Sequence, residues 1–103
     1  MSQKIIIRPQ AALDLYDQAI YLARHASPET ADRYLKCAND TFKAIARRPS
    51  MGRTSKYLNP SLSHTRLFRV QKFHKHVIFY CALKKAVEII RVVHGARDLE
   101  RLY

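Results

Sequence analysis

Residues 66–93 have the sequence RLFRVQKFHKHVIFYCALKKAVEIIRVV, in which short polar segments separate three apolar runs. The runs cover residues 66–70, 76–83 and 86–93, and they are rich in the β-branched and aromatic residues that favour strands. Connections this short make neighbouring strands antiparallel, so the stretch predicts a three-stranded meander. The second and third runs are apolar on both faces, and we therefore place them in the centre of the sheet.

Upstream of the meander, the sequence predicts a strand and two helices. Residues 4–8 (KIIIR) form a short β-branched run that Pro9 ends. Apolar residues then recur at spacings of three and four, which is typical of amphipathic helices. The first stripe consists of Ala12, Leu15, Tyr16, Ala19, Leu22 and Ala23, and the second of Ala31, Tyr34, Leu35, Ala38, Phe42 and Ile45. We expect the two helices to form an antiparallel hairpin whose aromatic residues belong to the core.

Local signals mark the ends of these helices. Ser27 is suited to be the N-cap of the second helix, Pro28 suits its first position, and Pro49 prevents the helix from continuing. Asp14 and Asp17 are expected near the positive N-terminal end of the first helix. The following stretch, residues 49–65, is rich in Ser, Pro and Gly and predicts a long loop.

The expected fold class is therefore α+β, a single domain over residues 1–103 with the order β-α-α-β-β-β and a short C-terminal helix. The helical hairpin packs on one face of a mainly antiparallel sheet, and the other face is partly bare or covered by a partner. The sequence contains no apolar run near the roughly 20 residues of a membrane helix, and MSQKIIIRPQ does not look like a signal peptide. Cys37 and Cys81 lack metal-ligand spacing, so we expect buried thiols in a cytoplasmic protein.

Positive charge is concentrated in one segment. The formal net charge is +11, and residues 41–87 contain eleven Lys or Arg but no Asp or Glu. Residues 1–40 and 88–103 are each neutral in this count. Such an imbalance favours a surface that contacts an anion: nucleic acid, the ribosome or an acidic protein.

Three quoted stretches carry a resemblance to a known family. RRPSMG (residues 47–52), FHKHVIFY (73–80) and VEIIRVVHGARDL (87–99) are similar to the ParE branch of the ParE/RelE toxin superfamily, which includes plasmid stabilisation proteins. The resemblance implies the toxin half of a type II toxin–antitoxin operon, which a small antitoxin neutralises by direct contact. ParE-type members poison DNA gyrase, whereas RelE-type members cut mRNA in the ribosomal A site.

A RelE-like activity would make the protein a metal-independent endoribonuclease. The resemblance then implies five catalytic candidates: Arg66, Arg69, His94, Arg97 and Tyr103. Arg66 and Arg69 are three apart on a strand, however, so they point to opposite faces and only one can belong to a given site. Residues 41–87 offer no carboxylate as a base, and a histidine before Gly95 is more often structural.

We therefore expect binding rather than bond chemistry, with gyrase as the target. The candidates for target contact are cations of the basic segment and of the C-terminal stretch: Arg53, Lys56, Arg69, Lys72, Arg97 and Arg101. Ribosome-dependent mRNA cleavage stays open as the alternative. A non-toxic nucleic-acid-binding module is disfavoured because no recognition-helix motif is present. We expect an acidic antitoxin as partner and neither a metal nor a cofactor, because no phosphate loop or paired Cys/His set occurs.

Overall fold

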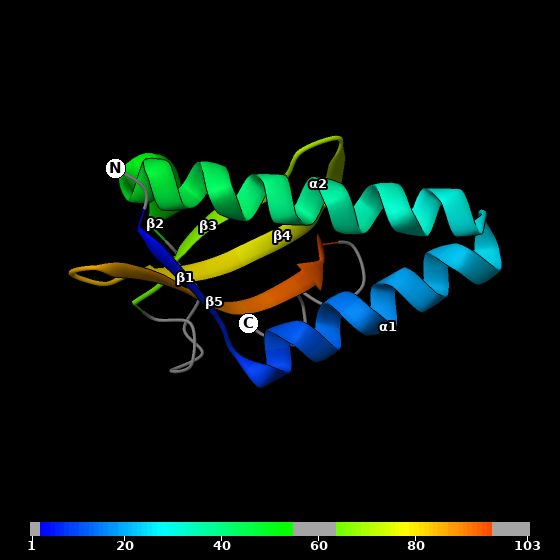
Figure 1. Cartoon of the computed structure of the whole chain (residues 1–103), viewed down its shortest axis with the longest axis horizontal. Helices are drawn as coiled ribbons and strands as arrows, with labels where there is room; N and C mark the ends of the chain where they lie inside the picture. The colour runs from blue at the N-terminus through cyan, green and yellow to red at the C-terminus, as the bar shows by residue number, and fades with distance from the viewer. Residues whose placement is uncertain (1–2, 55–63, 96–103) are drawn as a thin grey trace.

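A computed structural model describes residues 3–54 and 64–95 (Figure 1). The elements in chain order are β1 (Lys4–Ile7), α1 (Pro9–His25), α2 (Pro28–Arg47), the 3-10 helix η1 (Pro49–Met51), β2 (Arg53–Thr54), β3 (Arg66–Val70), β4 (Phe73–Ala82) and β5 (Ala86–His94). Within the described ranges the strands form one sheet in the order β1-β5-β4-β3-β2. The α+β class and the order of elements are as predicted, while the expected C-terminal helix lies outside the described residues.

The sheet is mainly antiparallel and contains the predicted meander. β3, β4 and β5 pair in sequence order, and β4 and β5 occupy central positions. β1 pairs with β5 in parallel, from Lys4 opposite Ala86 to Ile7 opposite Ile89. The first and the last described strands are therefore neighbours (Figure 1).

The start of β4 and the presence of β2 differ from the prediction, while the other strand ends agree with it to within one residue. β4 begins at Phe73 rather than at His76, because Phe73 pairs with Val70 and extends the ladder. The turn is thus confined to Gln71 and Lys72, and Lys72 has a positive φ of 66°. β2 lies within the stretch that was predicted to be loop, where it pairs with the start of β3.

The second helix has its predicted buried face. Its N-terminus is capped by Ser27, whose Oγ accepts a hydrogen bond from the Thr30 N–H at 3.1 Å. Its buried stripe packs with the side chains of β4 and β5 that face the helices. The fully buried members of this core with the largest side chains are Phe42, Ile45, Val70, Ile78, Tyr80, Val87, Ile89 and Val92, and Tyr34 of α2 is fully buried as well.

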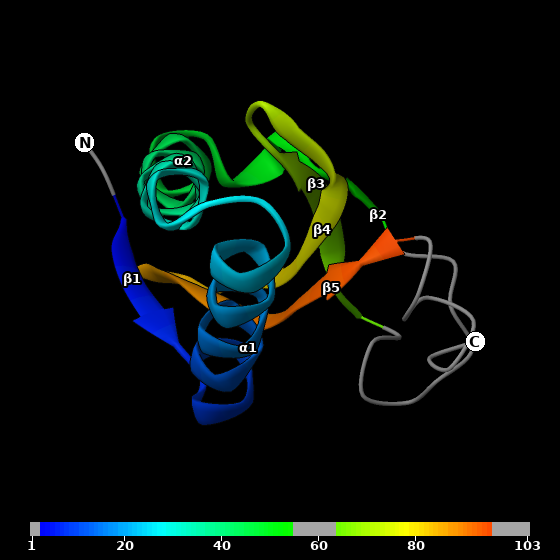
Figure 2. The same cartoon turned by 90° about the vertical axis from the view of Figure 1, so that its right-hand side faces the viewer.

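The buried face of α1 was predicted only in part: Leu15 packs against the core and Ala19, Leu22 and Ala23 are half-buried, but Ala12 and Tyr16 are exposed. Ala11, Asp14 and Gln18 are its buried residues, whereas Tyr16 is 56% exposed and does not belong to the core. The reason is the position of α1, which runs beside β5 where β1 has ended (Figure 2). Asp14 consequently faces the sheet and lies outside the first turn of the helix, contrary to the expected role at its positive end.

The opposite face of the sheet holds a second apolar cluster of Leu67, Val77, Phe79, Ile90 and Val93. These side chains are at most 8% exposed, so the expectation of a partly bare face is wrong for them. On β4 they alternate with the helix-facing residues, as the period of two requires. On β5 the register shifts, with Phe79 opposite Arg91 and Tyr80 opposite Ile89, so Ile90 and Val93 share a face although they are three residues apart.

The cysteines are half-buried free thiols rather than fully buried ones: Cys37 lies on α2 and Cys81 on β4. The described helices include none that is long and apolar enough to cross a membrane.

Candidate functional site

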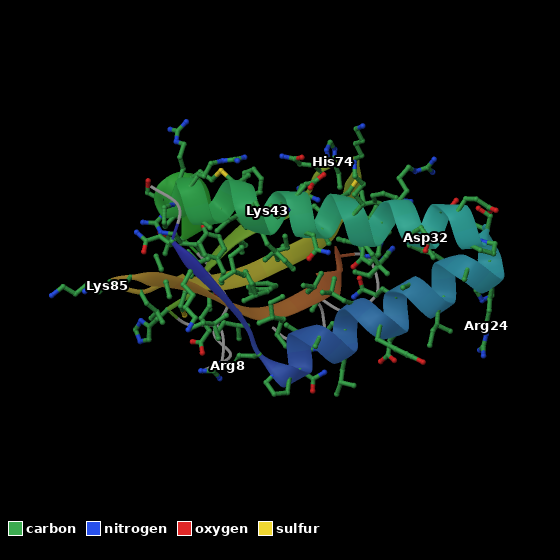
Figure 3. All side chains as sticks on the ribbon, viewed as in Figure 1. Arg8, Arg24, Asp32, Lys43, His74 and Lys85 are labelled. Atoms are coloured by element: carbon green, nitrogen blue, oxygen red, sulfur yellow. The ribbon has the colours of Figure 1, made fainter. Side chains whose placement is uncertain are left out.

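The hairpin of β3 and β4 separates two cavities. The first, here called the Arg69 cavity, has a volume of about 500 Å³ and is lined by Met51, Arg53, Leu67, Phe68, Arg69, Gln71, His74 and Val77. The second, the His94 cavity, has a volume of about 450 Å³ and is lined by Tyr21, Leu22, Lys72, Phe73, His74, Lys75, His76 and His94. His74 belongs to both, and in Figure 3 it lies beside α2 near the tip of this hairpin.

The Arg69 cavity brings together two of the predicted contact residues. Arg53 on β2 lies opposite Leu67 of β3, two positions before Arg69, so strand pairing places both guanidinium groups along one wall. Arg69 is exposed, and its Nη1 donates to the His74 carbonyl at 2.5 Å. None of the described lining residues is acidic. The cavity therefore combines an apolar floor with a cationic rim.

Arg66 takes a different position, on the opposite face of β3 from Arg69, as predicted from their spacing. Its Nη1 donates to the Gly52 carbonyl at 2.7 Å. The Tyr80 hydroxyl secures the same segment, since it donates to the Pro49 carbonyl at 2.6 Å and accepts from the Gly52 N–H at 2.9 Å. Arg66 thus holds the chain after α2.

Gly52 is required by this contact. A Cβ at residue 52 would lie 2.6 Å from the Tyr80 hydroxyl oxygen and 2.9 Å from the Leu67 carbonyl oxygen. Burial raises the pKa of the Tyr80 hydroxyl, and the Gly52 hydrogen bond and the Arg66 charge oppose that shift.

The His94 cavity contains Lys72 and His94 above a buried polar network. The rings of His76 and His94 are perpendicular, with centroids 5.1 Å apart. His76 is buried, and its Nδ1 lies 2.6 Å from Gln18 Oε1. The same oxygen accepts from the Tyr34 hydroxyl at 2.5 Å. Because an amide oxygen only accepts, the proton of this bond is assigned to His76 Nδ1.

Neither this network nor the ion pair beside it was predicted from the sequence. Asp14 Oδ2 accepts from Arg91 Nε at 2.8 Å and from the Val92 N–H at 3.0 Å. Gln18 Nε2 donates to the Val92 carbonyl at 2.7 Å. A signal was available: the spacing of four places Asp14 and Gln18 on one side of the helix, and a single arginine interrupts the apolar run of β5.

The remaining candidates fall outside the described ranges. They are Lys56, Arg97, Arg101 and Tyr103. In the part of the chain that the structure describes, no group of His, Cys, Asp and Glu residues is placed to hold a metal ion.

Comparison with known proteins agrees with this architecture. The family model described as "ParE toxin of type II toxin-antitoxin system, parDE" matches residues 5–99. A solved chain of the chromosomal ParDE TA system from P. aeruginosa is similar to this one, with a TM-score of 0.74 over 90% of this chain and 96% of that chain. At 16% sequence identity this likeness shows the shared fold alone. No curated protein sequence matches the chain.

Proposed function

This chain belongs to the ParE toxin family of type II toxin–antitoxin systems, and on that basis we propose that it inhibits DNA gyrase by binding it and that a small acidic antitoxin neutralises it. The observation that carries the proposal is the Arg69 cavity, with Arg53 and Arg69 beside an apolar floor. A surface of this kind suits a protein partner that inserts an apolar side chain flanked by carboxylates.

Binding accounts for the cations better than catalysis does. Arg66 is engaged with the Gly52 carbonyl and does not join Arg69, so the two arginines do not converge on one phosphate. The residues around Arg69 serve a contact surface, in which a few well-packed residues carry most of the binding energy.

One observation favours the alternative of ribosome-dependent mRNA cleavage. The residues that line the Arg69 cavity include His74 as well as Arg53 and Arg69. A histidine among the lining residues of a cavity with two arginines suits general-base catalysis with stabilisation of a phosphate. His74 is therefore the residue whose replacement separates the two functions.

The deciding experiment expresses the toxin without its antitoxin and follows two readouts. Purified gyrase is assayed for supercoiling and for stabilised cleavage complexes, and mRNA 5′ ends are mapped after induction. Gyrase inhibition with intact transcripts supports the proposal. Codon-phased cuts that His74→Ala reduces by about 10²-fold or more would replace it with the alternative.

Substitutions sharpen the same experiment. Arg53→Ala and Arg69→Ala should each weaken gyrase binding by about 1–2 kcal/mol, as expected for contacts in a distributed interface. Lys85→Ala is the matched control, because Lys85 lies at the β4–β5 end of the molecule (Figure 3). Equal effects at Arg69 and Lys85 would mean that general charge, and not this cavity, drives binding.

The proposed acidic antitoxin is tested by measuring how its rate of association with the toxin depends on salt. Charge concentrated in residues 41–87 should steer an acidic partner, so the association rate should fall steeply between about 50 and 500 mM salt. A rate that stays constant over this range would remove the electrostatic basis of the proposal.

A further inference from the structure

The proposed function makes no use of the His94 cavity, which lies on the side of the β3–β4 hairpin toward α1. Its volume of about 450 Å³ is within the range of small-molecule sites. Its lining comes from three parts of the chain: the end of α1, the β3–β4 hairpin and the last residue of β5.

Two aromatic side chains from different elements line this cavity. Phe73 of β4 is fixed by an edge-to-face contact with Tyr34, with ring centroids 5.3 Å apart. Tyr21 of α1 lies against His25, with centroids 4.2 Å apart and planes inclined by 31°. Both rings are therefore held by neighbours, which lowers the entropy lost when a flat ligand stacks on them.

Polar groups line the cavity between these elements. His76 is 6% exposed and is held by Gln18, while His94 is half-buried beside it. The two imidazole rings give this wall a polar character that suits the polar edge of a nucleobase, and the aromatic faces of Tyr21 and Phe73 can stack on the base itself.

The rim is cationic. Lys72 of the turn and His74 and Lys75 at the start of β4 are exposed lining residues, and none of the described residues lining the cavity is acidic. Lys72 has a φ of 66°, which a glycine or an asparagine adopts more readily than a lysine. A lysine at this position places an ammonium group at the rim at the expense of backbone conformational energy.

We propose that the His94 cavity binds a nucleoside phosphate, with the base between Tyr21 and Phe73 and the phosphate at Lys72 and Lys75. This ligand class combines a flat ring, a polar ring edge and an anion, which are the three features that the lining addresses. The ligand is a free nucleotide or the 5′ end of a single strand, since both present this chemistry. The proposal is independent of gyrase inhibition, because its test measures binding directly.

The test titrates the full chain, by calorimetry and by NMR of the histidine and tyrosine rings, with four probes. These are adenosine 5′-monophosphate, adenosine, inorganic phosphate, and a single-stranded hexanucleotide with a 5′ phosphate. We expect the monophosphate to bind at least about 10-fold more tightly than adenosine or phosphate alone, because stacking and charge act together. Phosphate that binds as tightly as the nucleotide would reduce the site to a cationic patch and overturn the proposal.

The hexanucleotide identifies the source of the ligand. Tighter binding of the hexanucleotide than of the monophosphate supports a strand end, and equal binding supports a free nucleotide. A glutamate-rich peptide that binds at least 10-fold more tightly than the monophosphate and displaces it would assign the cavity to a protein partner instead.

Matched variants locate the bound ligand. Tyr21→Ala should lower the affinity for the monophosphate at least about 5-fold, whereas Tyr16→Ala, on the same helix but outside the cavity, should leave it unchanged. Lys75→Ala should lower it as well, and Lys85→Ala at the other hairpin should not. Unchanged affinity in both Tyr21→Ala and Lys75→Ala would overturn the proposal.

Lys72→Gly gives a second, independent readout. Removing the side chain relieves the left-handed backbone, so the variant should melt at a higher temperature while it binds the monophosphate more weakly. A variant that gains stability and keeps its full affinity would show that Lys72 does not contact the ligand, contrary to the proposal.

Discussion

The two helices are both amphipathic, yet they bury different chemistry. α2 buries a mainly apolar stripe of Tyr34, Phe42, Ile45 and alanines that also includes Thr41, whereas α1 buries Asp14 and Gln18 together with Ala11. The difference follows from what each helix covers. α2 contributes to the main apolar core, while α1 lies beside the edge of β5.

Strand pairing explains why polar residues suit that edge. β1 pairs with β5 only as far as Ile89. Along the same edge of β5, the Arg8 N–H donates a hydrogen bond to the Ile89 carbonyl at 3.0 Å. Beyond it, the N–H and carbonyl of Val92 are bonded by Asp14 and Gln18. Two side chains one helical turn apart thus take the place of a strand, which satisfies backbone groups that would be costly to bury unpaired. A helix at a sheet edge is selected for hydrogen bonds as well as for apolar area.

The largest loss of stability is expected for a substitution on the buried face of α2. Phe42→Ala should lower the free energy of unfolding by about 3–5 kcal/mol, because the ring is 1% exposed and its removal leaves a cavity. Urea denaturation measures this loss. Lys43→Ala, on the exposed face of α2, is the control and should change stability by less than about 0.5 kcal/mol. A loss below 1 kcal/mol for Phe42→Ala would contradict the assigned core.

Removal of the buried carboxylate of α1 should destabilise the protein nearly as much. Asp14→Ala leaves Arg91 and the Val92 N–H without their acceptor, and we expect a loss of about 2–3 kcal/mol. This expected loss of unfolding free energy is smaller than that for breaking a fully buried ion pair, because the Arg91 side chain is 28% exposed. Asp14→Asn should lose less, since its oxygen can still accept from Val92.

Asp17→Ala is the control for the stability measurement on Asp14→Ala. Asp17 is exposed on the same helix, so Asp17→Ala should change the free energy of unfolding by less than about 0.5 kcal/mol. Similar losses at both positions would mean that helix charge, and not the edge of β5, explains the effect of Asp14.

A smaller effect should appear at alkaline pH, where the two helices meet. Burial, with a contribution from the Asp14 charge, raises the pKa of the Tyr34 hydroxyl above its ordinary value of 10.0. Above pH 10 the unfolded chain loses this proton while the folded chain keeps it. The free energy of unfolding should therefore fall by about 1.4 kcal/mol per pH unit for this group.

Tyr34→Phe isolates that contribution. The variant should lose about 1 kcal/mol at pH 7, where its hydrogen bond to Gln18 is missing, and should show a shallower decline above pH 10. The Tyr80 hydroxyl, whose pKa burial also raises, should keep part of the slope. Parallel pH profiles of the two proteins between pH 9 and 11 would refute the role of Tyr34.

The smallest effect is expected on the outer face of α1. Tyr16→Ser should change the free energy of unfolding by less than about 0.5 kcal/mol, because Tyr16 is 56% exposed. Chemical denaturation that shows a loss above 1 kcal/mol would restore the stripe predicted from the sequence and contradict the buried face described above.

Local patterns were sufficient for most of the fold. The bounds of β3 and the Ser27 cap agree with the prediction, because they depend on residues close together in the chain. The buried face of α1 was not predictable in this way. It depends on the Val92 backbone, which is 78 residues from Asp14, and apolar periodicity contains no information about such a partner.

The candidate site shows the same limit. The separation of Arg66 from Arg69 follows from the period of a strand and was predicted. The meeting of Arg53 with Arg69 depends on the short strand β2, which the composition of residues 49–65 concealed. The Gly52 carbonyl that holds Arg66 is likewise fixed by tertiary contacts.

The parallel pairing of β1 with β5 has a consequence for the time at which the toxin first exists in the cell. The 82 positions that separate Lys4 from its partner Ala86 take about 4–16 s to synthesise at the usual rate of translation. During that interval β1 has no neighbour, and the edge that α1 covers has not yet been made. The nascent chain therefore lacks the finished sheet until β5 has been synthesised.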